Sequence, residues 1–375
     1  MRTRKQAVLI ETLILLGVVA LLIFAAPAFL SDFRLNLLGK FLALGIVALA
    51  IDLIWGYTGL LSLGHGVFFG LGAYCMAMYL KLEVGAASSG ATSAYGSGTV
   101  LPDFMVWNGL TDLPWFWKPF QSFGFTLAMI VLVPATVAAL LGILTFRNRI
   151  RGVYFSILTQ AMALIFTTLF IGQQAYTGGT NGLTDFKTIL GAPINDVATQ
   201  HRLFDITVVV LAAVYIFCRL LTSGGFGRVL AAIRDDEGRL RFSGYDPAQF
   251  KVFVFAISAA LAGIGGALFV PQVGIISPSL MGVVPSIEMV IWVAVGGRGT
   301  LIGAIIGAIL VNSAKSFLSE SFPDFWLYFQ GSLFVAVVLL MPSGIVGTLA
   351  HLRTRRVSAP ARGPALVKQS AAETP

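Results

Sequence analysis

Two carboxylates lie inside strongly apolar stretches of this sequence. Asp52 stands in "LAIDLIWG" and Glu288 in "PSIEMVIWVAVGG". A charge at the centre of a membrane-spanning helix costs roughly 2.5–3.5 kcal/mol, so it needs a partner or a water-filled cavity. An ion pair, for example with Arg298, or a position near a helix end is the structural alternative to a place on a solute path. We treat both carboxylates as candidate path residues, although neither has a counter-ion evident in the sequence.

Glycine and small polar residues interrupt another apolar region, residues 56–74, which read "GYTGLLSLGHGVFFGLGAY". Because glycine permits positive φ and close backbone approach, these positions favour a break in a helix. A discontinuous helix near the bilayer midplane exposes backbone groups that can bind a small polar solute. Thr58 and Ser62 are the candidate solute contacts at this break, and His65 is a further candidate path residue there.

Helix packing is the competing interpretation of the same stretch. Gly66 and Gly70 are four residues apart, a spacing that lets two membrane helices approach closely. We expect His65 to form a hydrogen bond at a helix end rather than to carry protons, because no acidic residue stands beside it. Two further small-residue stripes are also interpreted as packing: Ser258, Ala262 and Gly266, and Gly299, Gly303 and Gly307.

A charged segment, "GGFGRVLAAIRDDEGRLRFSGYDPAQF" from residue 224, predicts a short amphipathic helix and then a sharp corner. Gly244 is placed to end this helix, and Asp246 followed by Pro247 is typical of the N-cap and first turn of the next one. A charged loop on the bilayer surface is the alternative. Ile233, Glu237, Leu240 and Gly244 form one stripe of the predicted helix, and Arg234, Asp235, Asp236, Arg239 and Arg241 cover the rest.

The composition is that of a membrane protein. Hydrophobic residues make up 57% and charged residues 11% of the 375 residues, and the mean hydropathy is +0.87. Soluble domains have about 45–50% apolar and about 25% charged residues. We therefore predict an all-α polytopic membrane protein with about ten transmembrane helices, in a range of about 8–10. The predicted spans are 7–30, 36–55, 67–80, 123–146, 152–171, 204–221, 250–272, 284–296, 300–317 and 325–347.

Basic residues predict the topology. With both termini on the cytoplasmic side, residues 147–151, 222–250 and 351–375 are cytoplasmic and carry most of the arginines, as the positive-inside rule expects. The net charge of +8 then reflects topology, and no nucleic-acid partner is implied. We expect residues 1–350 to form the transmembrane domain, with 7–30 retained as a span and an external loop at about 82–122. The tail 351–375 is expected to be disordered.

Signatures of hydrolytic enzymes and metal centres are missing from the sequence. It contains no G-x-x-x-x-G-K-[ST] loop, no G-x-S-x-G elbow and no H-E-x-x-H. Any ATP must therefore be hydrolysed by another chain. Cys75 and Cys218 have no His, Cys or carboxylate at ligand spacing, so we expect neither a disulfide nor a metal site. We predict a protein that is not an enzyme and binds no cofactor itself.

Three blocks, in the same order, resemble permease subunits of ATP-binding-cassette importers in the branched-chain amino acid permease family. They are "GYTGLLSLGHGVFFGLGAY", "AIRDDEGRLRFSGYDPAQFKVFVFAISAALAGIGGAL" and "WVAVGGRGTLIGAIIGAILVN", and the likeness covers roughly residues 40–350. Four further segments most resemble the urea-transport branch, including its long external loop: "LPDFMVWNGLTDLPWFW", "RGVYFSILTQA", "GGTNGLTDFK" and "VPQVGIISPSLMGVVPSIEMVIWVAVGGRGT".

The resemblance implies the permease fold of such importers and a division of labour. An extracytoplasmic solute-binding protein delivers solute, two related permease chains form the path, and two cytoplasmic ATPases use ATP. This chain would be one permease half in a bacterial inner membrane, importing urea by alternating access. Urea is neutral, so hydroxyls, amides and backbone carbonyls can recognise it without a charged partner.

The resemblance also implies that residues 233–244 dock into an ATPase. Glu237 stands at the family's acidic position and Gly244 at its glycine. Gly238 and Arg239 depart from the family, which usually has two small residues there. The implied coupling residues are Ile233, Arg234, Asp235, Asp236, Glu237, Leu240 and Gly244.

Other functions predict different observations. A branched-chain amino acid permease would be saturated by leucine or isoleucine and would ignore urea. A stand-alone urea channel or ion-coupled carrier would move solute without an ATPase. A membrane scaffold is disfavoured by the interior carboxylates and the glycine break, and a membrane enzyme is the least favoured class.

Overall fold

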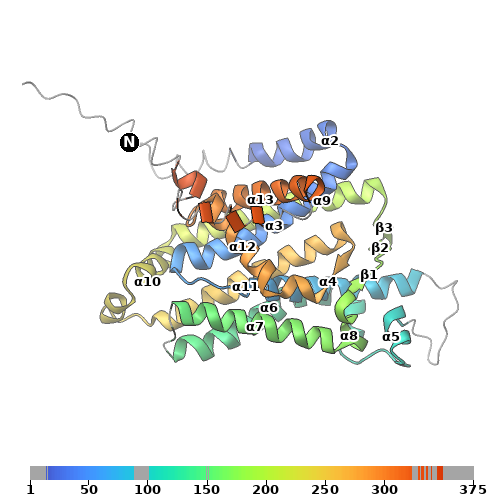
Figure 1. The fold of residues 1–375 in the computed structure, drawn as a ribbon, viewed down its shortest axis with the longest axis horizontal. Coiled ribbons are helices and arrows are strands. Elements are labelled where there is room, and N and C mark those ends of the chain that lie inside the picture. The colour runs from blue at the N-terminus through green and yellow to red at the C-terminus, as the bar shows by residue number, and fades with distance from the viewer. Residues whose placement is uncertain are drawn as a thin grey trace, which may run out of the picture.

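Apolar runs dictate the architecture, because a segment surrounded by lipid satisfies its backbone hydrogen bonds within a helix. The computed structural model is a helical bundle with two minimal sheets, drawn in Figure 1. It describes residues 14, 16–87, 101–148, 150, 152–322, 328–329, 331–332, 335–336, 339 and 344–348. The predicted tail at 351–375 and most of the predicted span at 325–347 lie outside these residues.

Six of the described helices are long and apolar enough to cross a membrane. They are accompanied by two shorter apolar helices, Leu16–Phe29 and α12 (Val283–Gly296), and by α4 (His65–Ala87). Each predicted span from 7–30 to 300–317 overlaps one of these helices, which confirms the polytopic all-α class. The six are α3 (Asp32–Thr58), α6 (Phe123–Arg147), α7 (Val153–Gly172), α9 (Val197–Ser223), α11 (Pro247–Val273) and α13 (Leu301–Ser321); Leu16–Phe29 contains η1 (Leu21–Ala25) and α2 (Ala26–Phe29).

Helix α11 packs against α3, α4 and α6, while α9 and α13 pack against α3. Small residues permit these approaches. A Cβ built on Gly72 would lie 2.2 Å from the carbonyl oxygen of Gly263, and one on Gly266 would lie 2.0 Å from that of Phe69. The predicted stripe that includes Gly266 is therefore a helix-packing surface.

Gly299, Gly303 and Gly307 were predicted to form one helix-packing stripe, and this prediction is wrong for Gly299. Gly303 and Gly307 lie where α13 crosses α12, because a Cβ on either would stand 2.7 Å from a backbone atom of Gly296. Gly299 instead lies in the turn that precedes α13, with φ at +77°. This left-handed conformation favours glycine for backbone reasons rather than helix packing.

The two ends of the bundle differ. Helix α10 (Gly225–Phe242) lies at the left end in Figure 1, and α5, α8 and β1–β3 lie at the opposite end. The predicted loop at 82–122 begins later than expected, because α4 continues to Ala87. Within the predicted loop, Trp117 is fully buried, and Asp103 accepts a 3.2 Å hydrogen bond from Lys81 of α4.

The remaining elements are short. Strand β1 pairs with β4 and β2 pairs with β3, both antiparallel. Their bounds are α5 (Asp103–Trp107), η2 (Lys118–Gln121), α8 (Gln174–Thr177), η3 (Gly179–Asn181), β1 (Leu183–Thr184), β2 (Thr188–Ile189), β3 (Ala192–Pro193), β4 (Ile275–Ile276) and η4 (Pro278–Met281).

Candidate functional site

The predicted helix break lies between α3 and α4. Helix α3 ends at Thr58, whose hydroxyl donates a 2.5 Å hydrogen bond to the carbonyl oxygen of Ile54. Gly59 follows with φ at +76°, and α4 begins at His65. A residue with positive φ cannot continue a right-handed helix, and glycine adopts this conformation without the steric cost of a Cβ atom. The glycine-rich stretch therefore contains the connection between two separate helices of 27 and 23 residues.

Helix α7 satisfies backbone groups of the break. The N–H of Leu63 donates to the Thr159 hydroxyl at 3.0 Å, and the Ser156 hydroxyl donates to the carbonyl oxygen of Leu61 at 2.7 Å. Buried backbone groups outside a helix require such partners. These two backbone groups already have protein partners, so they are not open to a solute in this conformation.

Both predicted packing glycines lie against η4 and the first turn of α12. A Cβ on Gly66 would lie 2.7 Å from the Ser286 hydroxyl oxygen, and one on Gly70 would lie 2.3 Å from a side-chain carbon of Met281. The N–H of Gly66 also donates to the Ser286 hydroxyl at 3.0 Å. Close packing accounts for both glycines.

Two buried polar side chains remain at the break. His65 Nε2 lies 2.7 Å from the Ser258 hydroxyl oxygen, and that hydroxyl donates to the carbonyl oxygen of Ala50 at 2.5 Å. Because a hydroxyl has one proton, His65 Nε2 is the donor in its pair. His65 thus forms a hydrogen bond at a helix start, as expected. Its Nδ1 and the hydroxyl of Ser62 are buried without partners among the described residues.

Asp52 joins α3 to the turn between α12 and α13. It is fully buried, and its Oδ1 accepts a 2.6 Å hydrogen bond from the N–H of Gly299. Arg298, in the same turn, lies over the Trp55 ring at 5.4 Å from its centroid and is not the ion-pair partner of either carboxylate. Asp52 therefore connects two elements far apart in sequence and does not cap the nearby end of α3.

Glu288 has a counter-ion that the sequence analysis missed. The Lys315 ammonium of α13 donates to both carboxylate oxygens, at 2.7 and 2.9 Å. The side chains of Glu288 and Lys315 are 15% and 39% exposed. The pair is therefore only partly desolvated, and Lys315 is the more exposed partner.

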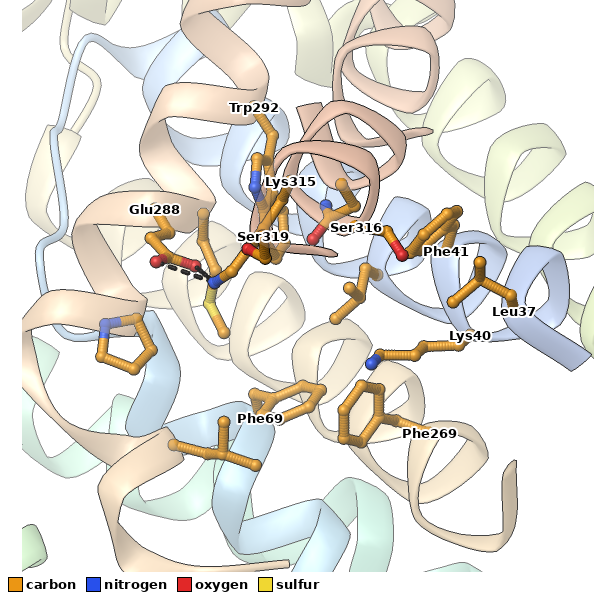
Figure 2. Close-up of a pocket in the computed structure, with 15 residues that line it drawn as sticks. Leu37, Lys40, Phe41, Phe69, Phe269, Glu288, Trp292, Lys315, Ser316 and Ser319 are labelled. Atoms are coloured by element: carbon orange, nitrogen blue, oxygen red, sulfur yellow. Dashed lines mark hydrogen bonds and ion pairs between the residues drawn. The ribbon is translucent and has the colours of Figure 1, made fainter. Parts of the chain in front are cut away.

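This ion pair lines a cavity of about 300 Å³ between α3, α4, α11, α12 and α13. Figure 2 shows the Glu288–Lys315 pair on one side and the Lys40 side chain reaching in from α3. Phe69 and Phe269 stand together on another side, and the Lys40 ammonium lies 5.7 Å from the centroid of Phe269. The cavity therefore combines charged groups with an aromatic wall.

The predicted amphipathic helix at 233–244 contains a kink. Asp236 has φ −160° and ψ 99°, which interrupts α10. Its carboxylate accepts hydrogen bonds from the N–H groups of Gly238, at 2.9 Å, and Arg239, at 3.3 Å. These are the bonds of an N-cap residue, so Asp236 begins a second helical piece. The predicted single stripe fails for this reason, and Gly244 is exposed after the helix with φ at +85°.

Glu237 is turned toward the protein. Its carboxylate accepts hydrogen bonds from Arg241 at 2.9 Å and from Lys251 of α11 at 2.6 Å, and its side chain is 11% exposed. At the following corner Asp246 accepts a hydrogen bond from the N–H of Ala248, which confirms the predicted N-cap before Pro247. Glu237 therefore fixes the geometry of α10 against α11.

Arg234 links α10 to the break. Its guanidinium donates a 3.0 Å hydrogen bond to the carbonyl oxygen of Gly56 in the last turn of α3. Its side chain also lies against Gly59, where a Cβ would stand 3.2 Å from Arg234 Cγ. Asp235 remains largely exposed, whereas Ile233 and Leu240 are buried.

The structure separates the sequence candidates into two regions. Asp52, Thr58, Ser62 and His65 lie at or near the break, to which Arg234 connects α10, whereas Glu288 lies in the cavity. Sequence reasoning missed the cavity lysines, Lys40 and Lys315. The available signal was a lysine within the otherwise apolar runs "NLLGKFLALG" and "GAILVNSAKSFL".

Long apolar helices with polar groups between them are typical of a polytopic membrane protein. The chain belongs to the family of the permease component of the branched-chain amino acid transport system, whose model matches residues 33–338. It is therefore a multi-pass permease subunit of an ATP-binding-cassette importer of this family, a transporter component and not an enzyme. The predicted family is confirmed.

Several curated proteins are similar to this chain. The permease protein LivM of the high-affinity branched-chain amino acid transport system of Escherichia coli K12 is 26% identical over 367 residues, or 92% of this chain and 76% of LivM. The LivH permease protein of Salmonella typhimurium is 22% identical, over 80% of this chain and 90% of LivH. The BraD permease protein of Pseudomonas aeruginosa is 28% identical over 149 residues, or 40% of this chain and 47% of BraD. No solved structure matches the chain significantly.

Proposed function

We propose that this chain forms one half of the solute path in an ATP-driven importer, with a second homologous permease subunit as the other half. Two ATP-binding subunits dock at α10 and use the ATP, and an extracytoplasmic binding protein delivers solute to the opposite end. The end that bears α10 then faces the cytoplasm, as do both termini. The chain itself binds no cofactor.

The observation that carries this proposal is the hydrogen bond between Arg234 and Gly56. A force applied to α10 by an ATPase reaches the end of α3 through this bond and through the contact of Arg234 with Gly59. The end of α3 is in turn joined to the α12–α13 turn by Asp52. A stand-alone channel has no need of such a connection from a charged terminal helix to its interior.

For the solute, the comparisons favour branched-chain amino acids over urea, because LivM, LivH and BraD are named for their transport. A cavity with charged groups and an aromatic wall suits a zwitterion with an aliphatic side chain. Urea remains the second candidate, on the likeness of segments such as "LPDFMVWNGLTDLPWFW" and "GGTNGLTDFK" to the urea-transport branch.

Uptake into proteoliposomes tests the proposal. The vesicles hold this chain, its permease partner and the ATPases, with the binding protein outside and ATP inside. Labelled leucine and labelled urea are supplied separately, and each protein is omitted in turn. Uptake that requires ATP and every component supports the importer, and the label that enters decides the solute. Uptake by this chain alone, indifferent to ATP, contradicts the proposal and indicates a channel.

A further inference from the structure

The cavity between α3 and α13 has an excess of positive charge. Its lining includes two ammonium groups, Lys40 and Lys315, but one carboxylate, Glu288. Glu288 is already engaged at both oxygens by Lys315. Within the part of the chain that the structure describes, Lys40 forms no ion pair, and its ammonium lies 5.7 Å from the centroid of the Phe269 ring.

An ammonium group without a counter-ion is costly inside a membrane protein. Binding of an anionic group beside Lys40 would supply that counter-ion. The Lys40 ammonium in Figure 2 points into the open space rather than away from it. The hydroxyls of Ser316 and Ser319, one helical turn apart on α13, line the same space. Hydroxyls can donate to the oxygens of a bound carboxylate alongside the ammonium.

The other side of the cavity is apolar. Phe69 and Phe269 stand against each other at 5.2 Å between centroids, and Leu44, Leu280 and Met289 add aliphatic surface. A ligand that fits this space carries an anionic head near Lys40 and a hydrocarbon body against the aromatic wall. Urea offers neither an anion nor a hydrocarbon body.

We propose that Lys40 binds the carboxylate of the transported solute, and that the cavity selects aliphatic carboxylates over neutral solutes such as urea. The inference rests on the proposed importer function, whose solute class it narrows. Glu288 pairs with Lys315, which leaves Lys40 as the lining cation that has no ion pair among the described residues.

Direct binding to the detergent-purified permease–ATPase complex, without the binding protein, tests this inference separately from transport. Labelled leucine is the probe. K40M should weaken leucine binding roughly tenfold to hundredfold, as expected for loss of a charge-assisted hydrogen bond. K40R should stay within about threefold of the unmodified protein, since it keeps the charge. K187M is the matched control, because Lys187 is an exposed lysine outside the cavity.

A ligand series avoids dependence on the folding of K40M. On the unmodified complex, 4-methylpentanoate, which is leucine without its amino group, should displace leucine. The amine 3-methylbutylamine, which lacks the carboxylate, should not. Displacement by the amine but not the acid, unchanged leucine binding by K40M, or binding of urea with no binding of leucine would each overturn the inference. A complex that binds leucine through Lys40 but shows no ATP-dependent uptake would overturn the importer function instead.

Discussion

Asp52 of α3 accepts a 2.6 Å hydrogen bond from the backbone N–H of Gly299, a residue 247 positions later in the chain. The packing around this bond is tight, since a Cβ on Gly56 would lie 2.4 Å from Asp52 Oδ1 and 2.6 Å from the Gly299 nitrogen. Arg298 and Trp55 lie beside the bond as a cation–π pair. Helix α3 and the α12–α13 turn are therefore held together at a contact that leaves no room for an extra atom.

Replacing Asp52 by alanine should lower the free energy of unfolding by about 1–3 kcal/mol, because the N–H of Gly299 loses its buried acceptor. D52N keeps an oxygen that can accept the same bond, so its loss should be smaller. Thermal unfolding of the purified protein, followed by intrinsic fluorescence, measures both variants. Equal destabilisation by D52A and D52N would contradict a role for the acceptor oxygen.

R234A should uncouple ATP hydrolysis from transport. We expect solute uptake by the reconstituted complex to fall roughly tenfold, which matches the loss of one hydrogen bond to a charged group, while the complex still assembles and hydrolyses ATP. R239A is the matched control, because the Arg239 side chain is 88% exposed and pairs with Asp236. Parallel measurement of ATPase activity and uptake separates uncoupling from loss of assembly. Similar uptake by R234A and R239A would exclude a special role for the Arg234–Gly56 bond.

K315M should destabilise the protein more than the double variant E288M/K315M. The single change leaves the Glu288 carboxylate, 15% exposed, without its counter-ion, whereas the double change removes both charges. We expect a coupling energy of roughly 1–3 kcal/mol, reduced from that of a fully buried pair because Lys315 is 39% exposed. A double-mutant cycle with E288M, measured by thermal unfolding, yields this energy. Additive effects would show that the pair contributes no stability.

The sequence was sufficient to predict the fold class and the ends of several helices, because hydropathy and turn residues are local signals. Gly59 ends α3 and Asp246 caps α11 through residues within a few positions of each other. The glycine stretch at 56–74 likewise contains the connection between α3 and α4.

The partners of side chains that meet residues far along the chain could not be predicted, because local sequence patterns do not indicate which distant residues come into contact. Glu288 finds Lys315 on the next helix, and Asp52 finds a backbone N–H that no residue type reveals. The kink at Asp236 was missed for a related reason. A helical stripe describes hydrophobic faces, but the Asp236 side chain captures two amides of the following turn and starts a new helical piece there.

The close crossing of α4 and α11 yields a final prediction about stability. A Cβ on Gly72 of α4 would lie 2.2 Å from the carbonyl oxygen and 2.4 Å from the Cα of Gly263 in α11, and both are backbone atoms that cannot move independently. G72A should therefore destabilise the protein by about 1–3 kcal/mol or more through overpacking.

The matched control is G172A, at the end of α7, where a Cβ would meet nothing within 4 Å. Alanine is the better helix former, so G172A should leave the stability unchanged or raise it by up to about 1 kcal/mol. Unfolding midpoints of both variants, measured in the same detergent and lipid mixture, compare the two sites. If G72A unfolds at the same temperature as G172A, then α4 and α11 do not approach as closely as described, and the central packing of the bundle must be looser.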